Sequence, residues 1–399
     1  MGTGCQPETD GGGPLTAPVF ILAGEPSGDR LAASLMEAVN GGWGQQDWIG
    51  VGGPAMRAQG LAGSVDMEAL TVFGFGAALA AYPRLSRLAD RLVDQIVQAR
   101  PKAVITVDVK GFSLRLAMRL KRRMAQLGWS APIIHCVAPT VWAWGAWRRH
   151  RVARAVDGLL CLFPFEPAYF DELDVKTHFI GHPEAFNPVY ERPQRVGAGG
   201  AVHLTILPGS RRGEIRHILD PMLSAFGMMT KRHPGITASI PTLPRLAPEI
   251  ASGCARHGVE GVVEIDQSEG ALFTALARSD AVLAASGTVT LQTALYGIPG
   301  VACYIAPKLS AAIGRRLVRM DRVILPNALL DREVYPFLFQ DAATPQAMAD
   351  GVAAVLADKS AMTRATEDAS LLRDQLRGGA TRFETKVGDA LAEWFGPRS

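Results

Sequence analysis

A phosphate-binding turn is predicted between Val202 and Ile215, where the chain reads VHLTILPGSRRGEI. The strand-like run Val202–Leu207 breaks at a turn that contains Gly209 and Ser210, and a helix is expected after the two arginines. Such a junction gathers backbone N–H groups and the positive end of a helix dipole at one point, which suits a phosphate. Arg211 or Arg212 can add a charge-assisted donor. An ordinary strand–helix turn with solvated arginines explains this pattern equally well.

A second junction of the same kind follows downstream. The apolar run Ala281–Ala285 predicts a buried strand, and Ser286, Gly287 and Thr288 lead into a helix that carries Gln292 one turn in. Two such helix starts at the carboxyl edge of one parallel sheet are typical of nucleotide binding in doubly wound folds. The pair therefore predicts a diphosphate site with hydrogen-bond partners for a sugar. Neither a Walker A loop nor a GxGxxG motif is present.

Two carboxylates stand out beside the ends of predicted strands. Asp108 directly follows the predicted buried strand Ala103–Val107, at the edge where α/β enzymes place reactive groups. Glu25 lies in a glycine-containing turn, ahead of the residues Ser27 and Asp29 that would cap the following helix. A helix cap or a salt bridge remains the alternative explanation for Asp108.

An uncharged apolar segment begins at Val72 and contains Phe73, Phe75 and Leu79. Core packing is one interpretation of these side chains, and contact with acyl chains or a bilayer is the other. Arginine and lysine are clustered in 121–123, 148–154 and 315–322. These clusters are either solvated faces or surfaces that attract anionic lipid or phosphorylated substrates.

The bulk composition describes a globular protein. The 399 residues allow two domains, with 48% apolar and 20% charged residues. A net charge of only +3 does not indicate a nucleic-acid binder. The five cysteines form no CxxC pair and the eight histidines no metal-binding pattern, so buried thiols in a reducing compartment and no metal are expected. No signal peptide or spanning segment is predicted, which favours a cytoplasmic location or attachment to a membrane from the cytosol.

The order of strands and helices predicts an α/β protein with two Rossmann-like domains facing across a cleft. The C-terminal helices are expected to cover a domain or to pair with a second copy as a homodimer. The predicted limits are a flexible tail at 1–17, an N-terminal domain at 18–186, a linker at 187–200, a nucleotide-binding domain at 201–345 and a helical arm at 346–399.

Eight motifs, in order along residues 19–340, resemble lipid A disaccharide synthase, a family of inverting glycosyltransferases of the GT-B fold. The matching motifs are AGEPSGD at 23–29, VGGPAM at 51–56, VWAW at 141–144, FPFEP at 163–167, IGHP at 180–183, LPGSRRGEI at 207–215, ASGTVTLQ at 285–292 and LPNALLDRE at 325–333.

The resemblance implies condensation of UDP-2,3-diacylglucosamine with 2,3-diacylglucosamine 1-phosphate to a β-1',6 disaccharide and UDP, without metal or cofactor. It implies that Asp108 is the base, that Glu25 is needed for activity, and that Arg211 and Asn327 belong to the UDP-sugar site. It also implies that the segment from Val72 faces acyl chains, with the protein peripheral on the cytoplasmic face of the inner membrane.

The chain departs from the family pattern mainly on the acceptor side. Lys110 and Ser113 replace a proline and an asparagine near Asp108, Ala77 replaces a glutamate, and Gln292 replaces the usual ribose-binding glutamate. Two alternatives therefore stay open. One is another UDP-sugar GT-B enzyme, such as a UDP-N-acetylglucosamine 2-epimerase or a transferase with a different acylated acceptor. The other is a binding protein that has lost turnover.

Overall fold

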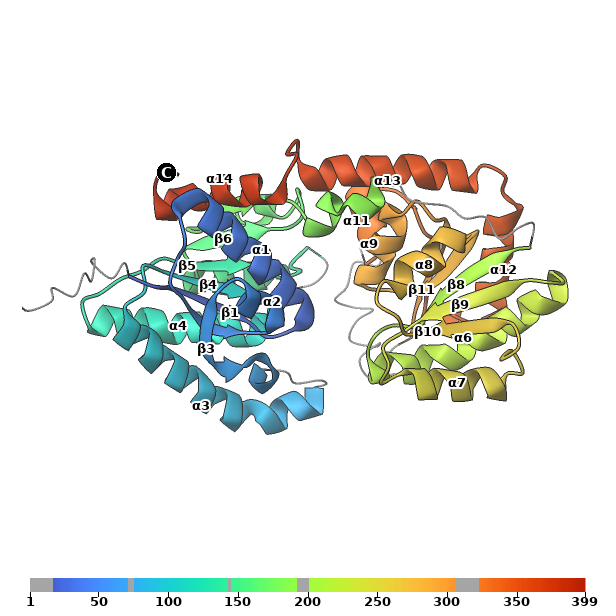
Figure 1. Cartoon of the computed structure of the whole chain (residues 1–399), viewed down its shortest axis with the longest axis horizontal. Helices are drawn as coiled ribbons and strands as arrows, with labels where there is room; N and C mark the ends of the chain where they lie inside the picture. Colours follow the sequence, from blue (N-terminus) through green and yellow to red (C-terminus); the bar gives the residue numbers. More distant parts are fainter. Residues whose placement is uncertain (1–16, 71–74, 143–144, 192–200, 306–322, 399) are drawn as a thin grey trace, which may run out of the picture.

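The computed structural model describes residues 17–398 except 71–74, 143–144, 192–200 and 306–322. It contains two parallel sheets, each covered by helices on both faces, that lie side by side (Figure 1). This arrangement confirms the predicted α/β fold with two Rossmann-like units. The domain limits given above stay predictions.

The first sheet has the order β3-β2-β1-β4-β5-β6-β7, so the order reverses between β1 and β4. Its strands are β1 Val19–Ala23, β2 Trp48–Gly52, β3 Leu61–Asp66, β4 Ala103–Val107, β5 Ile133–Cys136, β6 Gly158–Cys161 and β7 Lys176–Phe179. All neighbouring pairs are parallel. The switch point of a doubly wound sheet, here between β1 and β4, is where such folds place their ligands.

The second sheet has the order β10-β9-β8-β11-β12-β13, with its reversal between β8 and β11. Its strands are β8 His203–Leu207, β9 Thr237–Pro241, β10 Val263–Asp266, β11 Ala281–Ala285, β12 Gly300–Tyr304 and β13 Phe337–Phe339. Every residue of β8 and β11 is buried, as their apolar sequences predict.

The helices alternate with the strands. They are α1 Pro26–Trp43, α2 Pro54–Ala58, α3 Phe75–Ala99, α4 Lys110–Gln126, α5 Arg149–Ala155, α6 Arg212–Arg232, α7 Ala247–Arg256, α8 Ala271–Arg278, α9 Thr288–Leu295, α11 Leu325–Leu330, α12 Pro345–Ala357, α13 Ala361–Arg377 and α14 Phe383–Phe395.

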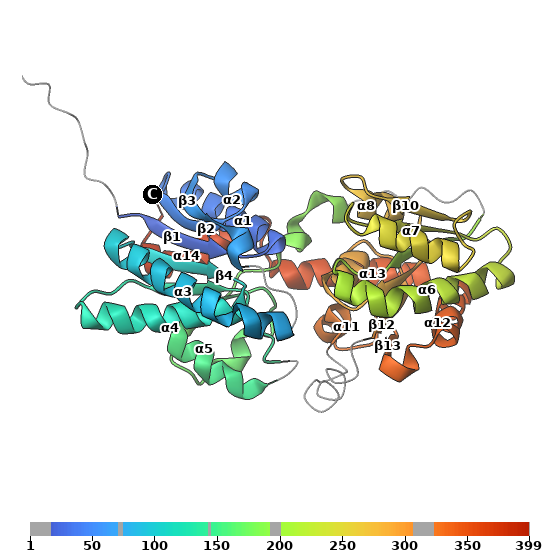
Figure 2. The same cartoon turned by 90° about the horizontal axis from the view of Figure 1, so that it is seen from below.

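Alternate residues of each strand pack against different helices. In β1, Val19 and Ile21 contact the core under α1 and α14, whereas Phe20 and Leu22 contact the core under α3, α4 and α5. Figure 2 shows α3, α4 and α5 together on one side of the first sheet. Both faces of the sheet are therefore buried.

The C-terminal helices return to the first unit, as predicted. α12 packs on α6 and β12 of the second unit, α13 packs on α9, and α14 packs on α1 of the first (Figures 1 and 2). A Cβ on Gly158 would lie 2.3 Å from the Trp394 ring, so only glycine permits this contact. The arm thus covers the first sheet of its own chain, and pairing with a second copy stays a prediction.

Three strands were not predicted: β3, β7 and β13. All three lie at sheet edges, and two of them are also short or poorly buried. β13 has three residues, and β7 reads KTHF with none of its residues buried. The predicted burial of the thiols is confirmed for Cys136, Cys161, Cys254 and Cys303.

We expect Leu391→Ala to destabilise the chain, because Leu391 of α14 is fully buried against the first sheet. Removing a buried leucine side chain costs about 2–5 kcal/mol. The measurement is the midpoint of thermal unfolding. Leu371→Ala is the matched control, since Leu371 of α13 is 51% exposed. Equal midpoints for the two variants would contradict the packing of α14 on the first sheet.

Candidate active site

The two predicted phosphate turns lie next to each other in the structure. β8 and β11 are paired in parallel, with Ala284 opposite Leu207. Neighbouring strands lie about 4.8 Å apart, so the turns that leave their carboxyl ends are adjacent. The sheet thus brings together Gly209–Arg211 and Ser286–Thr288.

The backbone of the first turn requires glycine at position 209. Gly209 has a φ of +103°, and a Cβ there would lie 2.7 Å from a carboxylate oxygen of Glu214. Arg211 is the N-cap of α6 and makes no side-chain capping bond. Its guanidinium is 57% exposed and lies 3.3 Å from Glu214 Oε1. An exposed ion pair of this kind is weak, so an anionic ligand can compete for Arg211.

The second turn is also uncapped. Gly287 is the N-cap of α9 without a side-chain capping bond, and a Cβ there would meet no atom within 4 Å. Gly287 and Thr288 are exposed and Ser286 is half-buried. The first N–H groups of α9 are therefore left for water or a ligand. Thr290 stabilises the turn, because its hydroxyl donates a hydrogen bond to the Gly287 carbonyl at 2.7 Å.

Asn327 fixes a loop in this structure. Its side-chain nitrogen donates to the Tyr335 carbonyl at 2.8 Å, and its side-chain oxygen accepts from the N–H groups of Val334 and Tyr335 at 3.1 and 3.0 Å. These bonds hold the segment after α11. A direct contact between Asn327 and a nucleotide stays a prediction.

Asp108 lies in a strained turn at the carboxyl end of β4. Asp108 and Val109 have φ values of +52° and +46°, in the left-handed region that β-branched residues rarely adopt. The Asp108 N–H donates to the Cys136 carbonyl at 3.0 Å, and the Ser113 hydroxyl donates to the Asp108 carbonyl at 2.8 Å. Strain of this kind costs about 1–3 kcal/mol per residue and concentrates at functional sites.

Glu25 reaches the same edge of the first sheet. Ala23 lies opposite Val107, so the turns after β1 and β4 are neighbours. A Cβ on Gly24 would lie 2.6 Å from Val109 Cγ2, which shows that the two turns touch. Glu25 is half-buried and makes no capping bond with its side chain. The turns that carry Glu25 and Asp108 are therefore neighbours at this edge of the sheet.

Asp29 has a structural role that the sequence did not reveal. Its buried carboxylate accepts hydrogen bonds from the N–H groups of Gly53, Ala55 and Met56 at 2.8, 2.9 and 3.2 Å. Asp29 thus caps α2, a helix 24 residues or more away in sequence, and not its own helix. This contact links the motifs at 23–29 and 51–56.

Glu166 is a second buried carboxylate with backbone partners. It accepts from the N–H groups of Leu162 and Phe163 at 3.0 and 3.1 Å and from Trp142 Nε1 at 3.4 Å. The Phe163 ring stacks on His182 with centroids 5.6 Å apart. Trp142, Phe163 and His182, one from each of three motifs, therefore belong to one aromatic cluster beside β6.

The predicted acyl-facing residues cannot be placed. Phe73 lies outside the described residues, as do the side chains of Phe75 and Leu79. The described part of this face carries two large exposed aromatic side chains, Tyr82 at 46% and Trp147 at 72%. Exposed arginines accompany them on α3, α4 and α5: Arg84, Arg87, Arg91, Arg122, Arg123, Arg151 and Arg154.

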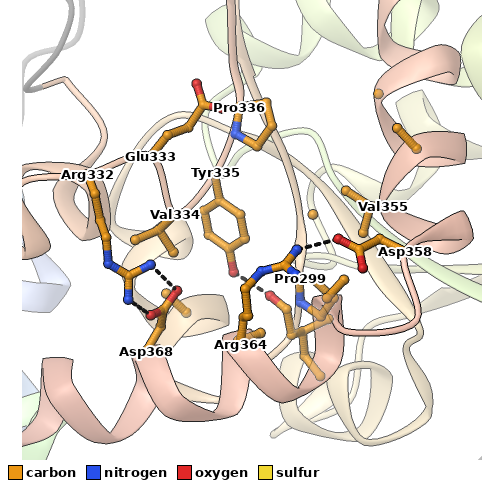
Figure 3. A pocket seen from close by; sticks show the side chains of 17 residues that line it. Pro299, Arg332, Glu333, Val334, Tyr335, Pro336, Val355, Asp358, Arg364 and Asp368 are labelled. Carbon is orange, nitrogen blue, oxygen red and sulfur yellow. Dashed lines mark hydrogen bonds and ion pairs between the residues drawn. The ribbon is translucent and has the colours of Figure 1, made fainter.

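A cavity of about 310 Å³ lies at the opposite edge of the second sheet (Figure 3). It is lined by Pro299 and Pro336, which precede β12 and β13, so it opens at the amino ends of the strands. Arg332 pairs with Asp368 there, and Arg364 pairs with Asp358. Both guanidinium groups are neutralised, and the cavity is separate from the phosphate turns.

Within the part of the chain that the structure describes, no group of three metal-ligating side chains occurs. Of the helices placed there, none combines the length and apolar character needed to cross a membrane.

Two parallel sheets in tandem, with helix starts without side-chain caps at the switch point of the second, define the GT-B fold. Solved structures with this fold include S. aureus MnaA with UDP, at 10% identity, a TM-score of 0.60 and coverage of 95% of this chain and 97% of that one. MurG of Acinetobacter baumannii has 13% identity and a TM-score of 0.54, and the match covers 95% and 99% of the two chains. At these identities the likeness concerns the fold alone.

A family model described as lipid-A-disaccharide synthetase matches residues 19–387, and the chain belongs to this family. The lipid-A-disaccharide synthase of Rhodospirillum centenum is 37% identical over 353 residues, which are 86% of either chain. That of Pseudomonas paraeruginosa is 36% identical over 355 residues, 86% of this chain and 90% of the relative. The resemblance found in the sequence is thereby confirmed.

We expect Asp29→Ala to lower the stability of the chain, because it leaves three backbone N–H groups of the α2 start without their acceptor. The loss should be about 1–3 kcal/mol. Thermal unfolding of Asp29→Ala and Glu25→Ala tests the two roles, since Glu25 makes no capping bond. A lower midpoint for Glu25→Ala than for Asp29→Ala would contradict the assignment.

Proposed function

We propose that the chain transfers a diacylglucosamine from UDP to the 6-hydroxyl of 2,3-diacylglucosamine 1-phosphate, which yields the β-1',6 disaccharide 1-phosphate and UDP. The proposed binding of UDP rests on the two helix starts without side-chain caps, those of α6 and α9, which follow the neighbouring strands β8 and β11. Family membership supports the choice of lipid substrates.

In this proposal the UDP diphosphate is held by backbone N–H groups at the starts of α6 and α9. Gly209, Ser210, Ser286, Gly287 and Thr288 form the turns, and Arg211 exchanges its weak bond to Glu214 for a phosphate oxygen. Negative charge grows on the diphosphate as the bond to the sugar breaks. Fixed N–H dipoles and a guanidinium stabilise that charge without reorganisation.

Asp108 is the proposed general base. Its carboxylate takes the proton of the acceptor 6-hydroxyl while that oxygen attacks the anomeric carbon of the donor. The bond from the anomeric carbon to the diphosphate breaks on the opposite face, UDP leaves with the electron pair, and the configuration inverts. The strained turn fixes the direction of the carboxylate, and Glu25, on the adjacent turn, orients the acceptor.

We also propose that the face formed by α3, α4 and α5 rests on the cytosolic surface of the membrane. Exposed arginines attract anionic lipid, and exposed tryptophan and tyrosine suit the membrane interface. Phe73, Phe75 and Leu79 would then extend this face toward the acyl chains.

An assay in detergent micelles with EDTA tests the reaction. UDP-2,3-diacylglucosamine and 2,3-diacylglucosamine 1-phosphate should give disaccharide and UDP in equal amounts. Asp108→Asn should lower the rate by about 10²–10⁴-fold and leave UDP binding intact, because a general base contributes about that much. Asp171→Asn is the matched control, since Asp171 is exposed in the same unit.

A free or epimerised sugar without disaccharide would favour the epimerase alternative. UDP binding without turnover in the parent chain would favour a binding protein. An unchanged rate for Asp108→Asn would remove Asp108 from the mechanism.

A further inference from the structure

One carboxylate of the first unit contacts α9, the helix that begins at the second predicted phosphate turn. Glu184 lies in the short 3₁₀ helix Pro183–Phe186, which follows the first sheet. Its Oε1 accepts a hydrogen bond from Gln292 Nε2 at 3.2 Å. Gln292 belongs to α9, so this contact joins residues 108 positions apart in the chain.

Further hydrogen bonds position this carboxylate. Glu184 Oε2 accepts from the Tyr190 hydroxyl at 2.8 Å. Burial and the neighbouring Glu184 raise the pKa of Tyr190, so its hydroxyl stays a donor. The Glu184 N–H donates to His182 Nδ1 at 3.2 Å. Burial lowers the pKa of His182 to about 4, so its ring is neutral near pH 7 and able to accept.

The position of Gln292 fits a sugar that follows a diphosphate. Gln292 is four residues beyond Thr288, which is a rise of about 6 Å from the helix start. Side chains on a helix lean toward its N-terminus, so the Gln292 amide points back toward the phosphate turn. In doubly wound folds a carboxylate commonly accepts a hydrogen bond from a ribose hydroxyl of the bound nucleotide. Gln292 is neutral, and the nearby carboxylate is that of Glu184.

We propose that Glu184 binds the ribose hydroxyls of the donor nucleotide, with Gln292 and Tyr190 as its positioning residues. A carboxylate offers about four lone-pair sites. Tyr190 and Gln292 each occupy one site, on different oxygens, which leaves a site on each oxygen for a ribose diol. This inference rests on the proposed binding of UDP at the α6 and α9 starts.

The pairing also explains why position 292 carries an amide. A glutamate there would place a second carboxylate against Glu184, and two like charges at this separation repel. An amide instead donates to Glu184. The negative charge proposed to contact the ribose thus lies on the 3₁₀ helix Pro183–Phe186 of the first unit and not on α9.

Titration calorimetry of the full chain with UDP and with 2'-deoxy-UDP tests the inference. The parent should bind UDP about tenfold more tightly, the value expected for a hydrogen bond to a charged group. Glu184→Gln should reduce this ratio to about twofold or less. Glu191→Gln is the matched control and should keep the parent ratio, because Glu191, which follows Glu184 closely in the chain, pairs with Arg377. The ratio does not depend on the folded fraction of a sample.

A charge exchange provides the second arm. Gln292→Glu alone should weaken UDP binding, and the double variant Glu184→Gln/Gln292→Glu should regain the preference for UDP, because the carboxylate then lies on α9. An equal affinity of the parent for both nucleotides, or an unchanged ratio in Glu184→Gln, would overturn the role of Glu184. If the parent chain binds both nucleotides equally but still forms disaccharide, the proposed function stands. A parent that neither binds UDP nor forms disaccharide would overturn both.

Discussion

The parallel pairing of β8 with β11 is the constraint on which the proposed donor site depends. It sets Leu207 opposite Ala284, and every later feature follows from this register. Two helices then start at one edge, both without side-chain caps, and their dipoles add at the same place. A shift of one residue would turn the buried side chains of the shifted strand toward the opposite face of the sheet, so the hydrophobic core fixes the geometry of the polar site.

The first sheet uses its switch point differently. Its adjoining turns also lead into helices without side-chain caps, α1 and α4, but these turns carry two carboxylates, Glu25 and Asp108, the second on a strained backbone. Packing over-determines that strain, because Gly24 leaves room for Val109 and Ser113 holds the Asp108 carbonyl. Helices α13 and α14 run from the second unit back to the first, where α14 packs on α1. The two units are therefore connected by packed helices as well as by the chain between them.

Local signals were enough to predict the buried strands, the strand–helix turns after β8 and β11, and the place of Asp108 beside β4. The same signals could not reveal Asp29, Glu166 or Glu184, because each carboxylate has partners that only the fold brings near. Asp29 looks like a cap for its own helix, yet it caps α2. In the sequence, Gln292 is a neutral residue where the family usually has a glutamate. In the structure, the carboxylate of Glu184 lies beside it. The edge strands were missed because their residues carry no strong alternation.

Hydrogen exchange of the full chain with and without UDP tests the central claim most directly. The account predicts slower amide exchange on UDP binding at residues 209–215 and 286–292, the starts of α6 and α9. No matching change is expected around Arg332 and Arg364, which line the cavity at the opposite edge of the sheet. Protection at that cavity, with exchange at the two helix starts unchanged, would contradict the account.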